Sequence, residues 1–249
     1  MHHFAPPNCL YVMKATSRVL ILILTVCLFI SAQAQDTLGL GAAPTLTVGV
    51  YQAAVGENIP YNEGREFTGY GIKLEGHAFL EIDQTSPGNI LYDGTLYYGV
   101  PMLYDLMSDE VVVKARKYDY LIRLSREKVP SFHFRGHDFF RADPDSTGNK
   151  YYETLYKGGT HVFARKRKQL NHSTGQEKAI DRFDEYDTYY ILRDGEINRV
   201  SGKKAVLEVY KEHKDDLRKL ISQESLNFKN DPENLLVRCA TTFDQLKRK

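Results

Sequence analysis

A unit that occurs twice, sixty positions apart, is the strongest constraint on how this chain folds. Gly76-His77-Ala78-Phe79 opens the first copy and Gly136-His137-Asp138-Phe139 opens the second. Both copies predict a strand, a polar turn and a strand. A repeated supersecondary unit predicts a sheet built by iteration rather than a single catalytic centre. The nine identical positions of the windows 76–99 and 136–159 are the Gly, His and Phe of the opening and then Asp83/Asp143, Ser86/Ser146, Gly88/Gly148, Asn89/Asn149, Tyr92/Tyr152 and Gly99/Gly159.

The first 34 residues are expected to be an export signal. Lys14 and Arg18 supply positive charge, Val19–Ile30 is an unbroken apolar run, and Ala32-Gln33-Ala34 matches the small-x-small cleavage pattern. The apolar run is shorter than the about 20 residues that a membrane-spanning helix needs. The sequence therefore predicts cleavage before Gln35, no transmembrane anchor afterwards, and an exported protein of the periplasm or outer envelope.

The predicted initiator is Met13, because it starts a more ordinary export signal than the first residue does. Residues 35–45 are predicted to be a flexible lead-in.

The expected mature chain has few options for covalent or metal chemistry. Cys239 is then the only cysteine, so neither an intramolecular disulfide nor a cysteine-based zinc site is expected. Loss of the two signal charges changes the formal net charge from +1 to about −1, which argues against nucleic-acid binding.

From residue 46 to residue 200 the pattern predicts an antiparallel β-meander. Apolar and aromatic residues alternate with polar ones, beginning with a strand at Leu46–Ala54. Asp93-Gly94 and Asp194-Gly195 each separate two apolar runs, which is the strongest local signal for a type I′ hairpin. Lys157-Gly158-Gly159 predicts another turn. Consecutive strands are expected to be neighbours, and so long a sheet is expected to curl or close to limit its free edges.

After the predicted sheet the hydrophobic period changes from 2 to 3.6. Apolar residues from Val206 to Ile221 predict one amphipathic helix with Ser201 as its N-cap. A second helix is predicted from Asp231-Pro232, with Asp as N-cap and Pro in the first position. The predicted fold class is therefore α+β: a curved antiparallel β-meander, open or partly closed like a barrel, over 46–200, and two C-terminal helices over 201–249 that pack on it.

The equivalent histidines of the two copies, His77 and His137, are candidate functional residues. They could bind a ligand or exchange protons, or they could have a structural role in which the imidazole bonds a backbone carbonyl beside a glycine bend. His133 and His137 have the i, i+4 spacing of a helical metal pair. The alternation around them instead predicts one strand, in which they would lie about 13 Å apart. No metal or cofactor is expected.

The densest basic run of the sequence is the second candidate site. The run consists of Arg165, Lys166, Arg167 and Lys168. It could meet an anionic partner such as a lipid headgroup or a polysaccharide, or it could be a solvated strand end.

Motifs of common enzyme classes are missing from the sequence. The chain contains no Gly-x-Ser-x-Gly elbow, phosphate-binding Gly-rich loop or dinucleotide fingerprint, so the sequence favours a protein that is not an enzyme.

Two segments carry a resemblance to known sequences. Gly-His-x-Phe and Leu-Tyr-Asp-Gly-x-Leu-Tyr lie within 76–104, and the tail runs from Ser201-Gly-Lys-Lys to Leu226-Asn-Phe-Lys. Together they resemble a family of small exported β-rich proteins of Gram-negative bacteria that has no assigned activity. The resemblance covers most of the mature chain. It implies an exported compartment and a β-rich architecture, and it carries over no catalytic residue.

Three functions remain open at this point. The leading hypothesis is a non-enzymatic envelope protein that acts as a binding or assembly module, with an envelope protein or an apolar or anionic envelope ligand as its partner. A carrier of a lipid or acyl chain would need an empty apolar cavity of a few hundred Å3 between sheet and helices. A module without such cargo should have that face filled by the helices. A hydrolase would need His77 or His137 within hydrogen-bond reach of a carboxylate and a nucleophile.

Overall fold

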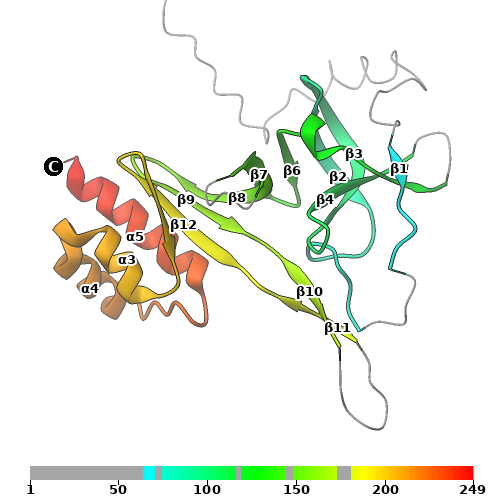
Figure 1. The fold of residues 1–249 in the computed structure, drawn as a ribbon. Helices are drawn as coiled ribbons and strands as arrows, with labels where there is room; N and C mark the ends of the chain where they lie inside the picture. The colour runs from blue at the N-terminus through cyan, green and yellow to red at the C-terminus, as the bar shows by residue number, and fades with distance from the viewer. Residues whose placement is uncertain (1–63, 71–74, 116–118, 144–147, 173–180, 249) are drawn as a thin grey trace, which may run out of the picture. The chain divides into compact units, whose positions relative to one another are not determined.

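The computed structural model is an α+β protein in which antiparallel strands come first and helices last, as the sequence predicts (Figure 1). The expected export signal, the lead-in 35–45 and the expected strand Leu46–Ala54 lie outside the described residues. None of the described helices is both long and apolar enough to cross a membrane. The structure describes residues 64–70, 75–115, 119–143, 148–172 and 181–248.

One sheet contains eleven strands in the order β1-β5-β4-β3-β2-β6-β7-β8-β9-β12-β13, and β10 and β11 form a separate two-stranded sheet. The strands are β1 Arg65–Glu66, β2 Ser86–Tyr92, β3 Thr95–Asp105, β4 Glu110–Lys114, β5 Leu121–Arg123, β6 Ser131–Phe134, β7 His137–Ala142, β8 Lys150–Lys157, β9 His161–Arg165, β10 Lys168–Asn171, β11 Arg182–Glu185, β12 Thr188–Arg193 and β13 Glu196–Val200. The helices are α3 Lys203–Val209, α4 Lys214–Gln223 and α5 Pro232–Lys247.

The order of the strands departs from a simple meander around β1, β5 and β6, and again where β9 pairs with β12 because β10 and β11 form the separate sheet. β6 pairs with β2 and not with β5, while β1 pairs with β5. Between β5 and β6 the chain makes a 3-10 turn at Arg126–Lys128 and then joins the sheet at the opposite edge of the β2–β5 unit. The expectation that consecutive strands are always neighbours was wrong here, because this pairing is set by packing and not by the length of a turn.

The two Asp-Gly turns are confirmed. Tyr92 pairs with Thr95 across Asp93-Gly94, and the φ angles of those two residues are 49° and 78°. Asp194-Gly195 has φ angles of 50° and 83° between β12 and β13. Positive φ at both central residues defines a type I′ turn, which matches the twist of the flanking strands.

A third such turn went unpredicted. Arg135-Gly136 has φ angles of 52° and 87° and joins β6 to β7, so that Phe134 pairs with His137. The prediction of one continuous strand through His133 and His137 was therefore wrong. Arginine rarely occupies a positive-φ position, so the dipeptide gives a weak turn signal.

The sheet is strongly curved around its first core. β3 and β8 are separated by β2, β6 and β7, so a flat sheet would hold them about 19 Å apart at about 4.8 Å per strand. Yet the ring of Tyr104 in β3 lies 5.8 Å from that of Tyr151 in β8. Tyr104 also lies within 5.1 Å of Phe132 and 4.9 Å of Phe139. The sheet remains open, with β1 and β13 as its edges.

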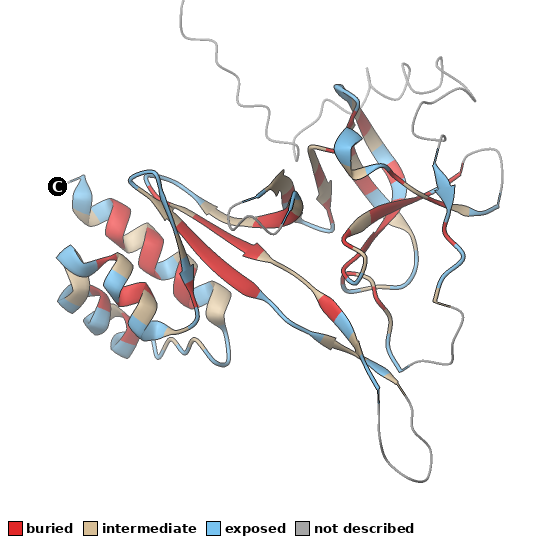
Figure 2. Ribbon diagram, in the orientation of Figure 1, coloured by how far each residue is buried: buried red, intermediate tan, exposed pale blue. Residues whose placement is uncertain are grey.

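A second core forms where the helices cover β8, β9, β12 and β13. Buried side chains of α3, α4 and α5 contact Val162, Ala164 and Ile191, and they recur along α5 between exposed ones (Figure 2). This face of the sheet is therefore covered by helix side chains. The helical side chains of this core are Val206, Leu207, Tyr210, Leu217, Ile221, Leu235, Leu236, Cys239, Ala240 and Phe243.

Three α-helices replace the expected two. The first predicted helix is divided into α3 and α4 by a 3-10 turn at Lys211–His213. The guanidinium of Arg193 in β12 donates a hydrogen bond to the carbonyl of Val209 at the end of α3 and pairs with Glu212. The hydrogen bond from Arg193 satisfies the Val209 carbonyl at the break between α3 and α4. The predicted cap was wrong too, since Gly202 is the N-cap of α3 and Ser201 precedes it.

The start of α5 follows the prediction. The side chain of Asp231 accepts a hydrogen bond from the backbone N–H of Asn234, and Pro232 occupies the first turn, where its missing N–H is not needed. This fixes where the helix begins, beside the segment that links it to α4.

Candidate ligand-binding groove

Lys166, directly after β9, is the centre of a cluster of charged groups. Its ammonium lies 3.0 Å from a carboxylate oxygen of Asp187 and 3.8 Å from one of Glu153, and it pairs with Glu233 at the start of α5. Only 15 % of the Lys166 side chain and 6 % of the Glu153 side chain are exposed. Burial alone would lower the pKa of Lys166, but the carboxylates of Asp187 and Glu233 raise it above its ordinary value.

His137 continues this cluster on its other side. Its Nδ1 lies 2.6 Å from Oε1 of Glu153, and its Nε2 lies 3.1 Å from Oε1 of Glu81. Glu81 also accepts a hydrogen bond at 2.6 Å from Arg135. The hydrogen bond to Glu153 raises the pKa of His137 to about 9, against the opposing effect of burial. The ring is therefore protonated at neutral pH and donates from both nitrogens.

This arrangement does not suit a general base. A base must accept a proton, and it works best with a pKa near the operating pH. Both nitrogens of His137 face carboxylates, so neither is available to a hydroxyl or thiol nucleophile. His137 has the carboxylate that the hydrolase hypothesis requires, but it has no free nitrogen for the chemistry. The geometry assigns it to an ionic link between β7, β8 and the segment that contains Glu81.

The structure does not place His77 in an equivalent position. His77 accepts a hydrogen bond at 3.2 Å from the backbone N–H of Phe79, a local contact within an irregular segment. The first repeat copy was expected to begin with a strand, yet only isolated bridges occur there, at Glu75 and Phe79. His77 and His137 are therefore not brought together, and the expected bond to a carbonyl is a bond from an N–H.

The basic run does not form a solvated patch. Lys168 is buried and donates hydrogen bonds to the carbonyls of His77 and Phe79, and it also lies 3.2 Å from a carboxylate oxygen of Glu185. Arg165, Lys166 and Arg167 are half-buried. Two of the four charges, those of Lys166 and Lys168, are therefore engaged in ion pairs within the protein.

His133 and His137 lie on neighbouring strands of the β6–β7 hairpin. His133 is the cross-strand partner of Asp138, and 2.8 Å separate its Nδ1 from the Asp138 Oδ1. His137 is the cross-strand partner of Phe134, and its ring faces Glu153. The two rings therefore project from opposite faces of the hairpin and do not share a ligand. No group of three or more His, Cys, Asp or Glu side chains within the described ranges could hold a metal ion.

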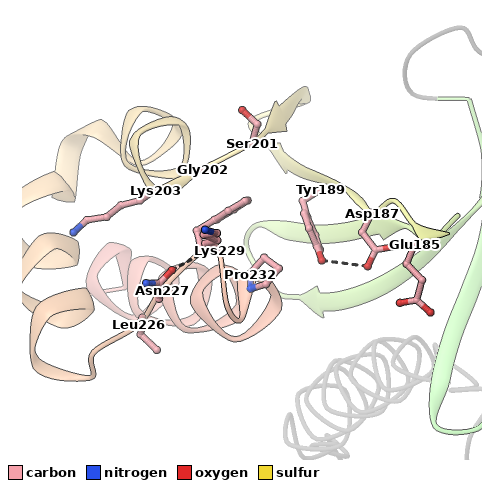
Figure 3. A pocket seen from close by; sticks show the side chains of 11 residues that line it. Glu185, Asp187, Tyr189, Ser201, Gly202, Lys203, Leu226, Asn227, Lys229 and Pro232 are labelled. Atoms are coloured by element: carbon pink, nitrogen blue, oxygen red, sulfur yellow. Dashed lines mark hydrogen bonds between the residues drawn. The ribbon is translucent and has the colours of Figure 1, made fainter. Parts of the chain in front are cut away.

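A groove of about 790 Å3 opens beside the Lys166 cluster (Figure 3). Asp187 and Tyr189 line one wall, and Pro232 lies between them and the loop that joins α4 to α5 (Figure 3). The link from β13 to α3 also lines the groove, and it begins directly after Val200, the cross-strand partner of Tyr189. The lining residues are Glu185, Asp187, Tyr189, Ser201, Gly202, Lys203, Leu226, Asn227, Phe228, Lys229 and Pro232.

The loop 226–229 is held in place by local and aromatic contacts. Oδ1 of Asn227 accepts a hydrogen bond at 2.8 Å from the backbone N–H of Lys229 (Figure 3). Phe228 packs edge-on against Tyr189, with 5.9 Å between ring centroids. The Tyr189 hydroxyl donates to Asp187 at 3.3 Å. Apolar rings and polar groups therefore lie side by side along the groove.

The groove residues were not among the sequence candidates. Ser201-Gly-Lys-Lys and Leu226-Asn-Phe-Lys had been singled out only for the family resemblance. Phe228, between an Asn and a Lys in a short helix–helix link, was a sequence signal that could have indicated a binding loop. Binding residues concentrate on loops that a rigid scaffold positions. What the sequence could not indicate is that both segments reach the same end of β12.

Comparisons with known proteins add no relative to this picture: no family model matches the chain, and no curated protein or solved structure is similar to it.

Proposed function

We propose that this protein is an exported, non-enzymatic binding module of the cell envelope, and that the groove between β12, α3 and the α4–α5 loop is its ligand site. The groove carries the proposal: its volume of about 790 Å3 lies within the range of small-molecule sites, and it combines aromatic and polar side chains. Export and the envelope location rest on the predicted signal in residues 1–34 and on the resemblance to exported β-rich proteins.

The alternatives of the sequence analysis have less support. The sheet face beneath the helices is filled by side chains, which disfavours an acyl chain enclosed there. A hydrolase using His137 would need a free ring nitrogen, and both nitrogens face carboxylates.

Gly202 offers a sharp way to block the groove. A Cβ atom built at Gly202 meets no atom within 4 Å, and its φ of 172° is extended backbone that other residues adopt. Gly202→Trp should therefore place an indole at the groove wall while the fold is kept. Gly202→Ala is the matched control.

The experiment is native mass spectrometry of the chain from Gln35 onward, purified from its own envelope fraction. We expect a bound small mass with the wild type and Gly202→Ala, and none with Gly202→Trp. A mass that persists in Gly202→Trp, or bare protein in every sample, would overturn the proposed site. Cell fractionation tests export separately, and a chain that stays in the cytoplasm would contradict the envelope assignment.

A further inference from the structure

We infer that the groove selects an anionic saccharide, a conclusion that rests on the proposed function and names its ligand class. The first step is the balance of charge along the groove. Its two acidic residues each have a lysine partner within the protein, Glu185 with Lys168 at 3.2 Å and Asp187 with Lys166 at 3.0 Å, and Lys166 also pairs with Glu153 and Glu233. Lys166 and Lys168 therefore hold the two acids of this wall in internal ion pairs.

The two lysines that line the groove have no such partner. Within the described residues, no carboxylate lies in ion-pairing distance of Lys203 or Lys229, and both side chains are exposed. Lys229 lies between the start of α3 and Pro232, whereas the Lys203 side chain extends along the rim away from Tyr189 (Figure 3). Lys229 thus brings to the groove an ammonium that has no carboxylate partner among the described residues, and a ligand carboxylate or phosphate would complement it.

The second step is the shape and polarity of the remaining lining. Tyr189, Phe228, Leu226 and Pro232 supply apolar surface, and Ser201 and Asn227 supply hydroxyl and amide groups beside it. A sugar ring has an apolar C–H face and a rim of hydroxyl groups, so it matches this alternation. An acyl chain would leave the polar groups unpaired, which costs free energy. A peptide strand would be expected at a free sheet edge, where backbone hydrogen bonds are available.

The test uses one saccharide with and without its charge. The trisaccharide of galacturonic acid and its fully methyl-esterified form have the same ring framework, and isothermal titration calorimetry measures the affinity of each for the mature protein. We expect the acid to bind at least tenfold more tightly than the ester. Binding of the acid should weaken as salt is raised from 50 to 500 mM, because exposed charges are screened over a few Å to about 10 Å.

Four variants locate the interaction. Lys229→Ala should weaken the acid about fivefold, the upper range for one exposed ion pair, and Lys203→Ala should weaken it less. Gly202→Trp should abolish binding of both sugars. Lys219→Ala changes an exposed lysine of α4 that does not line the groove, and it should leave both affinities unchanged.

Each other result has a distinct meaning. Equal binding of acid and ester that Gly202→Trp abolishes would overturn charge selection and leave the proposed groove intact. Undiminished binding of the acid to Gly202→Trp would show that the saccharide sits elsewhere and overturn the inference. Binding of phosphatidylglycerol vesicles without binding of the trisaccharide would overturn the saccharide class in favour of a lipid surface. If no probe binds, the saccharide class is wrong, and the native mass measurement alone decides the groove.

Discussion

The carboxylate of Asp244 accepts a hydrogen bond at 3.0 Å from the backbone N–H of Thr160, in the turn between β8 and β9. The same oxygen accepts a hydrogen bond at 2.9 Å from the hydroxyl of Tyr156. Asp244 is buried near the end of α5, so one carboxylate joins the C-terminal helix to a hairpin more than eighty positions earlier in the chain.

We expect Asp244→Ala to lower the free energy of unfolding by about 2–3 kcal/mol, because a buried N–H loses a charged acceptor. Urea denaturation followed by circular dichroism measures this. Asp215→Ala removes an exposed acid that pairs with Arg218 in α4, and it should cost less than about 1 kcal/mol. Equal losses for the two variants would show that the Asp244 contact does not anchor the helix.

Gly88 in β2 is expected to reject even a methyl group. An added Cβ would lie 2.3 Å from the sulfur of Met102 and 2.9 Å from the carbonyl oxygen of His133. Met102 can move but the carbonyl belongs to the paired strand β6, so Gly88→Ala should cost about 1–3 kcal/mol. Gly202→Ala, where nothing lies within 4 Å, should cost less than about 1 kcal/mol, the loss expected when alanine replaces glycine at an N-cap. Differential scanning calorimetry compares them, and an unchanged Tm for Gly88→Ala would contradict the close approach.

The link from His137 to Glu153 and Glu81 should make stability depend on pH. The pKa of His137 is raised from about 6.5 to about 9 in the folded protein, chiefly by Glu153. The folded state therefore holds the proton more tightly. Its stabilisation is fully present below pH 6.5 and is lost as the pH rises through about 9.

Urea midpoints of the wild type and His137→Gln at pH 6, 7.5 and 9.5 test this. The difference in midpoint should be largest at pH 6 and smallest at pH 9.5. His172→Gln is the control, since His172 is 71 % exposed beside Asp181. A difference for His137→Gln that grows towards pH 9.5 would have the wrong sign for this linkage.

Cys239 is expected to be inert while the protein is folded. It is fully buried in the helical core, and burial raises the pKa of its thiol to about 12. Because the thiolate is the reactive form, iodoacetamide at pH 8 should label the native chain from Gln35 onward far more slowly than the same chain in 6 M urea. Mass spectrometry measures the alkylated fraction. Rapid labelling without denaturant would mean that α5 detaches readily from the sheet.

Local sequence determined the elements whose energetics are local. Asp93-Gly94 and Asp194-Gly195 form type I′ turns because both positions need positive φ, and Asp231-Pro232 starts α5 because the cap and the first turn are satisfied within a few residues. The α+β class followed from the change of hydrophobic period. The repeat was less informative: it marked β8 correctly but predicted a strand around His77 that does not form.

Only the tertiary structure decided which of these elements meet. The pairing of β6 with β2, the turn at Arg135-Gly136 and the division of α3 from α4 depend on packing and on distant hydrogen bonds such as that from Arg193 to Val209. The same holds for the site. Lys166 resembled a surface charge in the sequence, yet Glu153, Asp187 and Glu233 surround it in space, whereas the groove lysines Lys203 and Lys229 have no carboxylate partner in the part of the chain that the structure describes. Electrostatic interactions depend on distance in space and on burial, and neither can be read from the spacing of residues along one chain.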